Sequence, residues 1–186
     1  MRMKVYLIAA LFAGCIFVSC KSNGFKENEG LYLMLYDLDN NAVSEAEVYV
    51  DEKFCGRTDV YGRFMFFFEE KERGENHLIR IKKEGYLSVE DKINYEASLF
   101  LYYRTGTFRQ YFEKGEKFLE QGKYKKAEES AELALKIEKR EDALYLKMLA
   151  LIKAGEKEKA EQLKKSFSED MKKKEYFTEL EEIDER

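Results

Sequence analysis

The chain has 186 residues, with 33 basic and 37 acidic side chains, one histidine, three cysteines, no tryptophan and no proline. Its length is enough for one ordinary domain or two small ones. Charged residues make up 38% of the chain and nearly balance in sign, at a net charge of -4, so the composition is that of a folded protein and argues against nucleic acid as the main partner.

The first nineteen residues have the pattern of a secretory signal. A basic start at residues 1–4 precedes an apolar run at 5–19, which is shorter than the roughly 20 residues of a membrane span. Cys15 and Cys20 each follow a segment that resembles the lipobox of bacterial lipoproteins, where the cysteine becomes the acylated first residue. Cleavage before Cys20 removes the whole apolar run, so we expect a signal peptide at 1–19 and a lipidated tether at 20–28.

This resemblance implies a protein held at the cell envelope by its lipid anchor, on the outer membrane or on a periplasmic or surface face. The alternative is an ordinary secretory signal with an incidental cysteine. Once Cys15 is removed and Cys20 is acylated, only Cys55 remains, so no intrachain disulfide is expected. Cys55 is predicted to be a half-buried strand residue, with an intermolecular bridge as the alternative.

Residues 29–104 carry short apolar runs separated by turn signals, which predicts a β domain. Turn signals lie at 37–41, at Gly56 and at 59–62. Many short strands without helical spacing predict a small antiparallel sandwich at the N-terminal end of an α+β chain. The expected strands cover residues 31–36, 46–50, 64–68, 77–82 and 97–103, and the continuous apolar run at 31–36 predicts a buried strand.

The segment LDNNAVSEAEVYVDEKFCGRTDVYGRFMF, residues 38–66, resembles the carboxypeptidase regulatory-like domain, a transthyretin-like sandwich. VYVDEKFCGRTD with the later HLIRIKKEGY also resembles the PEGA domain, although PEGA domains usually carry proline where this chain has Asp59. Both resemblances imply a non-catalytic accessory module of an exported protein. Carbohydrate or cell-wall binding by this sandwich is an alternative function, and it predicts an exposed aromatic pair on one sheet face.

Residues 105–186 change to helical spacing, and two stretches repeat one design. YFEKGEKFLEQGKYKKAEESAELALKI and LYLKMLALIKAGEKEKAEQLKKSF align so that Gly122 matches Gly155 and Ala127 matches Ala160. The spacing of 33 residues lies in the range of helical-hairpin repeats, and the stretches resemble the tetratricopeptide repeat. We expect about five helices, of which the last begins near Ser168 and covers the end of the stack.

Residue types that carry chemistry are scarce. His77, the single histidine, is predicted to lie at a sheet edge, and together with Cys55 it supplies too few ligands for a metal site. The sequence shows no phosphate-binding loop and no nucleophile with a base. We therefore expect no catalytic residue, metal, cofactor, nucleic acid or small-molecule substrate.

Protein binding is the preferred function. The tetratricopeptide resemblance implies a partner, expected to be another envelope protein, on the concave face of the helices. The alternative is that the residues of this face pack against the last helix or the sandwich. The predicted partner-binding residues are Phe112, Glu116, Leu119, Tyr145, Leu149 and Ile152.

Overall fold

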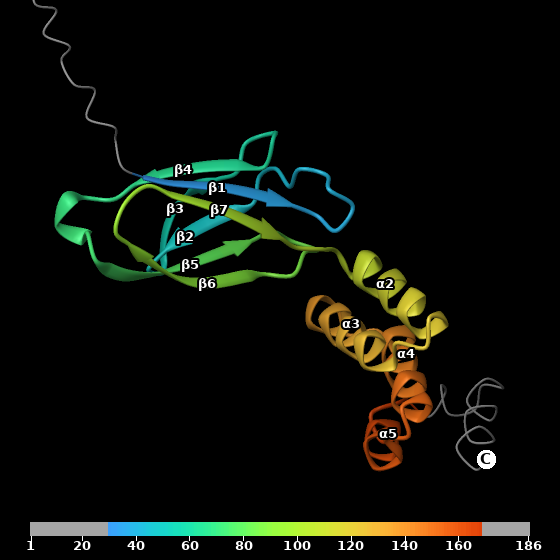
Figure 1. The fold of residues 1–186 in the computed structure, drawn as a ribbon. Coiled ribbons are helices and arrows are strands. Elements are labelled where there is room, and N and C mark those ends of the chain that lie inside the picture. The colour runs from blue at the N-terminus through green and yellow to red at the C-terminus, as the bar shows by residue number, and fades with distance from the viewer. Residues whose placement is uncertain (1–29, 169–186) are drawn as a thin grey trace, which may run out of the picture.

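The computed structural model describes residues 30–168, in which seven strands in two sheets precede four α-helices (Figure 1). The predicted α+β class, with strands first and helices last, is confirmed. The predictions for Cys20, for the residues around it and for the final helix lie outside the described residues. The strands are β1 (Gly30–Tyr36), β2 (Glu47–Val50), β3 (Lys53–Arg57), β4 (Arg63–Phe67), β5 (Glu75–Lys82), β6 (Val89–Tyr95) and β7 (Leu99–Arg104), and the helices are α2 (Phe108–Glu120), α3 (Tyr124–Ile137), α4 (Glu141–Lys153) and α5 (Lys157–Lys164).

The strands form two sheets. Sheet A has the order β4-β1-β7, and sheet B has the order β3-β2-β5-β6. The expectation of a purely antiparallel sandwich is wrong at one pair, because β1 is antiparallel to β4 but parallel to β7. Between β1 and β7 the chain makes β4 and all four strands of sheet B, and a parallel pair needs such a long crossover.

The two sheets enclose one apolar core. Successive side chains of a strand point to opposite faces, so every second residue of β1 faces inward. Leu31, Leu33 and Leu35 are thereby almost fully buried in one cluster with Val48 and Ile79 of sheet B. Burial of each such side chain contributes about 1.5–3 kcal/mol to folding.

Five strands lie close to the predicted ranges, whereas β3 and β6 were not predicted. Gly56 was expected in a turn, but it lies within β3, opposite a register shift between Val48 and Tyr49. Gly62 does occupy a turn, at a φ of 72°. A Cβ atom there would lie 2.3 Å from the carbonyl oxygen of Leu35, so this turn requires glycine.

The helix α2 begins and ends with local signals. Thr107 starts it with a capping box, in which the Thr107 hydroxyl accepts from the Gln110 backbone and the Gln110 side chain accepts from the Thr107 backbone. At its end, the backbone N–H groups of Gly122 and of the next residue donate to carbonyl groups of the last turn, at 3.0 and 2.8 Å. This is a Schellman ending, and α4 ends in the same way at Gly155.

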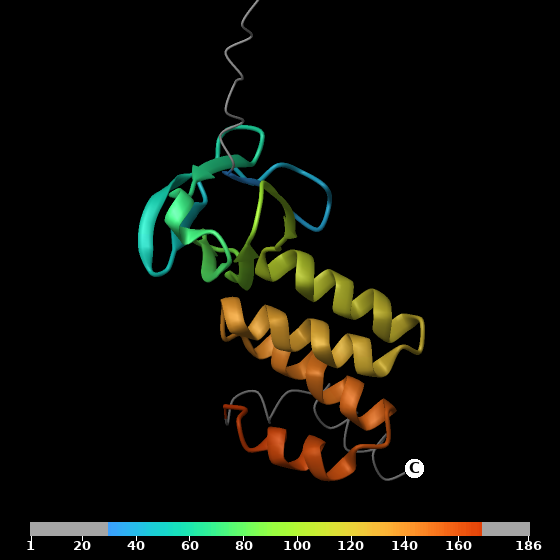
Figure 2. The same cartoon turned by 60° about the vertical axis from the view of Figure 1, so that its left-hand side comes forward.

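The helices stack side by side in chain order from α2 to α5, as Figure 2 shows. Gly115 of α2 allows the close approach, because a Cβ atom there would lie 2.8 Å from the Leu146 side chain of α4. Ala127 and Ser130 of α3 close the other side of the same contact. The small residues therefore let α2 pack against both of the next two helices.

The stack is joined to the sandwich by apolar contacts. Leu38 and Leu87 lie in loops of the β region, and both pack against the cluster that contains Phe108 of α2. The same cluster includes residues of α3 and α4. The sandwich thus shares a small second core with the beginning of the helical part.

A polar contact reinforces this junction. Asp37 accepts hydrogen bonds from Asn41 in its own turn and from the side chain of Gln110 in α2. Burial alone would raise the pKa of Asp37, but the bonds from Asn41, Gln110 and Asp39 outweigh it and hold the pKa below its usual value. The ionised carboxylate therefore stabilises the loop against the helix.

Candidate binding surfaces

The predicted partner-binding residues lie on two helices that touch, three on α2 and three on α4. Phe112 stacks on Phe108 with ring centroids 5.9 Å apart, so part of its ring supports the helix packing. Tyr145, Leu149 and Ile152 likewise pack against the cluster of buried residues at the α4–α5 hairpin. The five apolar side chains of the set are half-buried, and the sixth, a glutamate, is exposed.

That glutamate, Glu116, lies in an acidic neighbourhood. Partial burial raises the pKa of Glu116, and the negative charges of Glu113, Glu120 and Asp142 raise it further. The carboxylate is therefore less favourable here than in water. This face of α2 and α4 combines half-buried apolar side chains with a group of carboxylates, of which Glu113 and Asp142 are paired with Arg109 and Arg140.

His77 has a structural place that the sequence did not predict. It was expected at a sheet edge, but β5 is an interior strand of sheet B and the side chain is 4% exposed. One ring nitrogen, Nδ1, lies 2.7 Å from a carboxylate oxygen of Asp51, and the ring centroid lies 4.5 Å from that of Phe68. Burial opposes ionisation of Asp51, but bonds with His77 and Leu78 outweigh it and lower the pKa of Asp51.

Cys55 lies in β3 and is half-buried, as predicted for a strand cysteine. Its thiol donates to the carbonyl oxygen of Lys53 at 3.3 Å. Within residues 30–168, no group of three histidine, cysteine or acidic side chains is arranged to hold a metal ion.

A surface that the sequence did not predict is the outer face of sheet A. We use this name for the outward-pointing positions of its three strands, which follow from the strand register and from the alternation of buried and exposed residues. Tyr32, at the centre of the face, lies opposite Met65 on one side and opposite Phe100 on the other. The positions are Gly30, Tyr32, Met34, Tyr36, Arg63, Met65, Phe67, Phe100, Tyr102 and Arg104.

Large apolar side chains are exposed across this face. Phe100 is 76% exposed, Tyr102 57% and Met65 53%. Tyr32 stacks on Phe100 with centroids 4.9 Å apart, and Tyr36 stacks on Tyr102 at 5.3 Å. Exposed aromatic pairs of the kind that the carbohydrate hypothesis predicted are therefore present.

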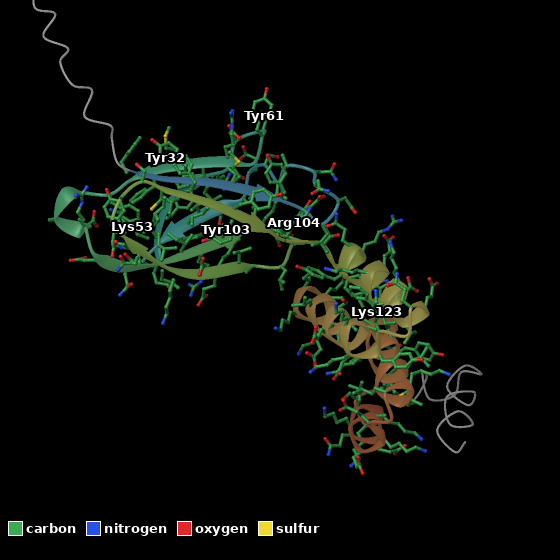
Figure 3. The ribbon with its side chains drawn as sticks, in the orientation of Figure 1. Tyr32, Lys53, Tyr61, Tyr103, Arg104 and Lys123 are labelled. Atoms are coloured by element: carbon green, nitrogen blue, oxygen red, sulfur yellow. The ribbon has the colours of Figure 1, made fainter. Side chains whose placement is uncertain are left out.

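One part of the face is hollowed. A depression of about 510 Å³ is lined by Tyr32, Met34 and Met65 and by the Arg63–Asp59 ion pair, whose closest atoms are 3.0 Å apart. The Arg63 guanidinium also lies over the ring of Tyr61, 4.6 Å from its centroid. Figure 3 shows the Tyr61 side chain pointing upward from the sandwich, away from sheet B.

The sequence did contain a signal for this face. In β1, β4 and β7, apolar residues occupy the inward-pointing and the outward-pointing positions alike. This pattern is typical either of a strand buried on both sides or of a strand with an exposed apolar face. The prediction for residues 31–36 was a buried strand. The structure places only the inward set in the core, so the second interpretation is the correct one.

Comparison with protein families and with curated proteins identifies no relative of this chain. None of the helices in the described part of the chain is long and apolar enough to cross a membrane. The sequence matches no protein-family model and no curated protein.

Proposed function

We propose that this protein is a non-catalytic lipoprotein of the bacterial envelope, anchored by acylated Cys20, whose helices bind a partner protein. The β domain would be an accessory module of the carboxypeptidase regulatory-like or PEGA type. The helices would be tetratricopeptide-like, with a fifth helix that begins near Ser168. In support, the first helix of each hairpin ends at a glycine in the same conformation, Gly122 and Gly155, at a spacing of 33 residues.

The observation that carries the proposal is the mixed character of the α2 and α4 face. Apolar side chains such as Leu119 and Leu149 accompany an acidic group, Glu116, whose pKa is raised by burial and by neighbouring carboxylates. A positively charged partner relieves this repulsion when it binds, so charge complementarity favours a basic amphipathic segment. The partner class is therefore an envelope protein with a basic amphipathic helix or peptide.

Crosslinking in native membranes, with identification of the product, tests this proposal. Glu116→Lys reverses a charge within the face, and we expect it to abolish the crosslinked product. Glu129→Lys is the matched control, because Glu129 is an exposed glutamate of α3, outside the predicted face. Tyr145→Ala combined with Leu149→Ala removes apolar contacts, and circular dichroism verifies that this double variant folds.

The outcomes separate the explanations. Loss of the product in Glu116→Lys, with retention in Glu129→Lys, supports binding at this face. Full retention in both Glu116→Lys and the folded double variant contradicts it. Mass spectrometry of the mature amino terminus tests the anchor separately, since an unmodified thiol at Cys20 excludes acylation.

A further inference from the structure

The outer face of sheet A is an apolar surface that no described segment covers. Single exposed apolar residues are ordinary on soluble proteins, but contiguous exposed patches usually mark contact sites. Here Phe67, Met65, Tyr32, Phe100 and Tyr102 belong to one face of three paired strands. The face has the character of a contact surface, and its occupant must be argued from its chemistry and position.

Ring geometry argues against a carbohydrate as the occupant. The rings of Tyr32 and Phe100 are within 12° of parallel and 4.9 Å apart, and those of Tyr36 and Tyr102 are 22° from parallel at 5.3 Å, so each ring covers one flat side of its partner. Side chains stand roughly perpendicular to a sheet, so stacked rings meet an approaching layer with their edges. A sugar ring would have to stack on the flat side that each pair leaves open, as at Phe100 on the edge strand β7, whereas a lipid surface contacts the edges of all four rings together.

The position of the face points to a lipid surface. Gly30, the first residue of β1, belongs to the face and pairs with Phe67. Residues 20–29 are ten residues long, and a chain of this length spans at most about 35 Å. If Cys20 is acylated, as the proposed function states, the face is held within that distance of the membrane.

The charges of the face agree with this position. Its ten positions include two arginines, Arg63 and Arg104, and no carboxylate. Arg63 is paired with Asp59 at the rim, whereas Arg104 contacts a neutral side chain, that of Asn40. Aromatic and methionine side chains with positive charge at their edge suit the anionic headgroups and the upper acyl region of a bilayer.

We propose that the outer face of sheet A lies on the membrane surface, with its aromatic side chains at the level of the lipid headgroups. This deepens the proposed function and rests on it, because it adds a second membrane contact that orients the anchored protein. In Figures 1 and 2 the helices leave the sandwich at the end of β7 and extend away from β1 and β4. A sandwich resting on this face therefore presents α2 to α5 to the aqueous space, where a partner can reach them.

Tryptophan fluorescence tests the contact, because the natural chain has no tryptophan and each variant carries a single reporter. The mature lipidated protein is placed in vesicles of phosphatidylethanolamine and phosphatidylglycerol whose acyl chains are brominated. Phe100→Trp reports from the outer face of sheet A. Phe54→Trp is the matched control, since Phe54 is a 52% exposed phenylalanine that pairs with Tyr49 on the outside of sheet B.

We expect brominated lipid to quench most of the fluorescence of Phe100→Trp and to leave Phe54→Trp unchanged. A second reporter, Tyr102→Trp, repeats the measurement if the first variant does not fold. Equal quenching of the reporters on both sheets, or none on either in vesicle-bound protein, overturns the inference and leaves the anchor intact. Failure of the wild-type protein to associate with vesicles instead contradicts acylation at Cys20 and the membrane contact together.

The same reporters separate other occupants from a lipid surface. A saturable response of Phe100→Trp to soluble cell-wall oligosaccharides in detergent, without quenching by brominated lipid, assigns the face to carbohydrate and overturns the membrane proposal. A blue shift that grows with protein concentration, without lipid or sugar, assigns the face to a second copy of the chain and also overturns it. Quenching by lipid without either response supports the proposal.

Discussion

The two sheets of the sandwich share one core but differ on their outer faces. The outside of sheet B carries cross-strand ion pairs, such as Arg80–Glu90 at 2.9 Å and Arg57–Glu47 at 3.0 Å, as expected of a face in water. The outside of sheet A carries stacked aromatic side chains and methionines. Folding needs only the inner faces to be apolar, so the apolar outer face of sheet A has another cause.

The largest expected effect is the loss of stability when a core side chain is truncated. It tests whether the inner faces of sheet A and sheet B contribute equally to the core. Leu33→Ala in sheet A and Ile79→Ala in sheet B each remove a fully buried side chain from the same cluster. We expect each to lower the free energy of unfolding by about 2–5 kcal/mol. Chemical denaturation measures both. A loss below about 1 kcal/mol in one of them would show that its sheet contributes little to the core.

An intermediate effect is expected just beyond β1, where the turn that contains Asp37 meets α2. Asp37→Asn weakens the bonds from Asn41 and Gln110, and loss of charge-assisted bonds of this kind costs about 1–3 kcal/mol at neutral pH. The folded pKa of Asp37 is lowered, so its contribution is complete above the usual pKa of aspartate and is lost as the pH falls through the folded value.

Denaturation of the wild type and of Asp37→Asn at a series of pH values measures this contribution. The difference in stability between the two proteins should shrink as the solution is acidified below the usual pKa of aspartate. A difference that stays constant down to the acid limit of folding would assign the effect of the substitution to packing and not to charge.

The smallest effects are expected on the outer faces. Arg80→Ala removes the pairs with Glu52 and Glu90, and we expect a small fall in melting temperature that disappears at high salt. Met65→Thr on sheet A should leave the melting temperature of the detergent-solubilised protein nearly unchanged, because the side chain is exposed and threonine suits a strand. A large loss with Met65→Thr would mean that the outer face of sheet A supports folding.

The helical part was predictable because its signals are local. Glycines such as Gly122 and Gly155 end helices through the conformation of their own backbone, and apolar spacing marks the helices between them.

The strand β6 was missed because an acidic residue, Asp91, occupies one of its inward positions. There it accepts a hydrogen bond from Tyr103 of the opposite sheet, at 2.8 Å. Burial, with this bond, raises the pKa of Tyr103, and no sequence pattern reveals such a long-range pair.

The candidate surfaces were predictable to different degrees. The placement of Phe112, Tyr145 and Leu149 on neighbouring helices follows from repeat spacing, and the structure agrees that these residues lie on α2 and α4. The acidic neighbourhood of Glu116 depends on Asp142, which the fold brings in from the next hairpin. The outer face of sheet A was missed because the alternation in a strand does not say which of two apolar faces another layer covers.

The parallel pairing of β1 with β7 also decides how the β domain bears load. The chain enters at the start of β1 and leaves for the helices at the end of β7, and the two strands share six residue pairs from Leu31–Leu99 to Tyr36–Arg104. Tension between the two ends therefore slides one strand along the other and strains all the pairs together. An antiparallel pair pulled from the same end would unzip one bond at a time, so this topology makes the domain a mechanically resistant link between whatever holds its two ends.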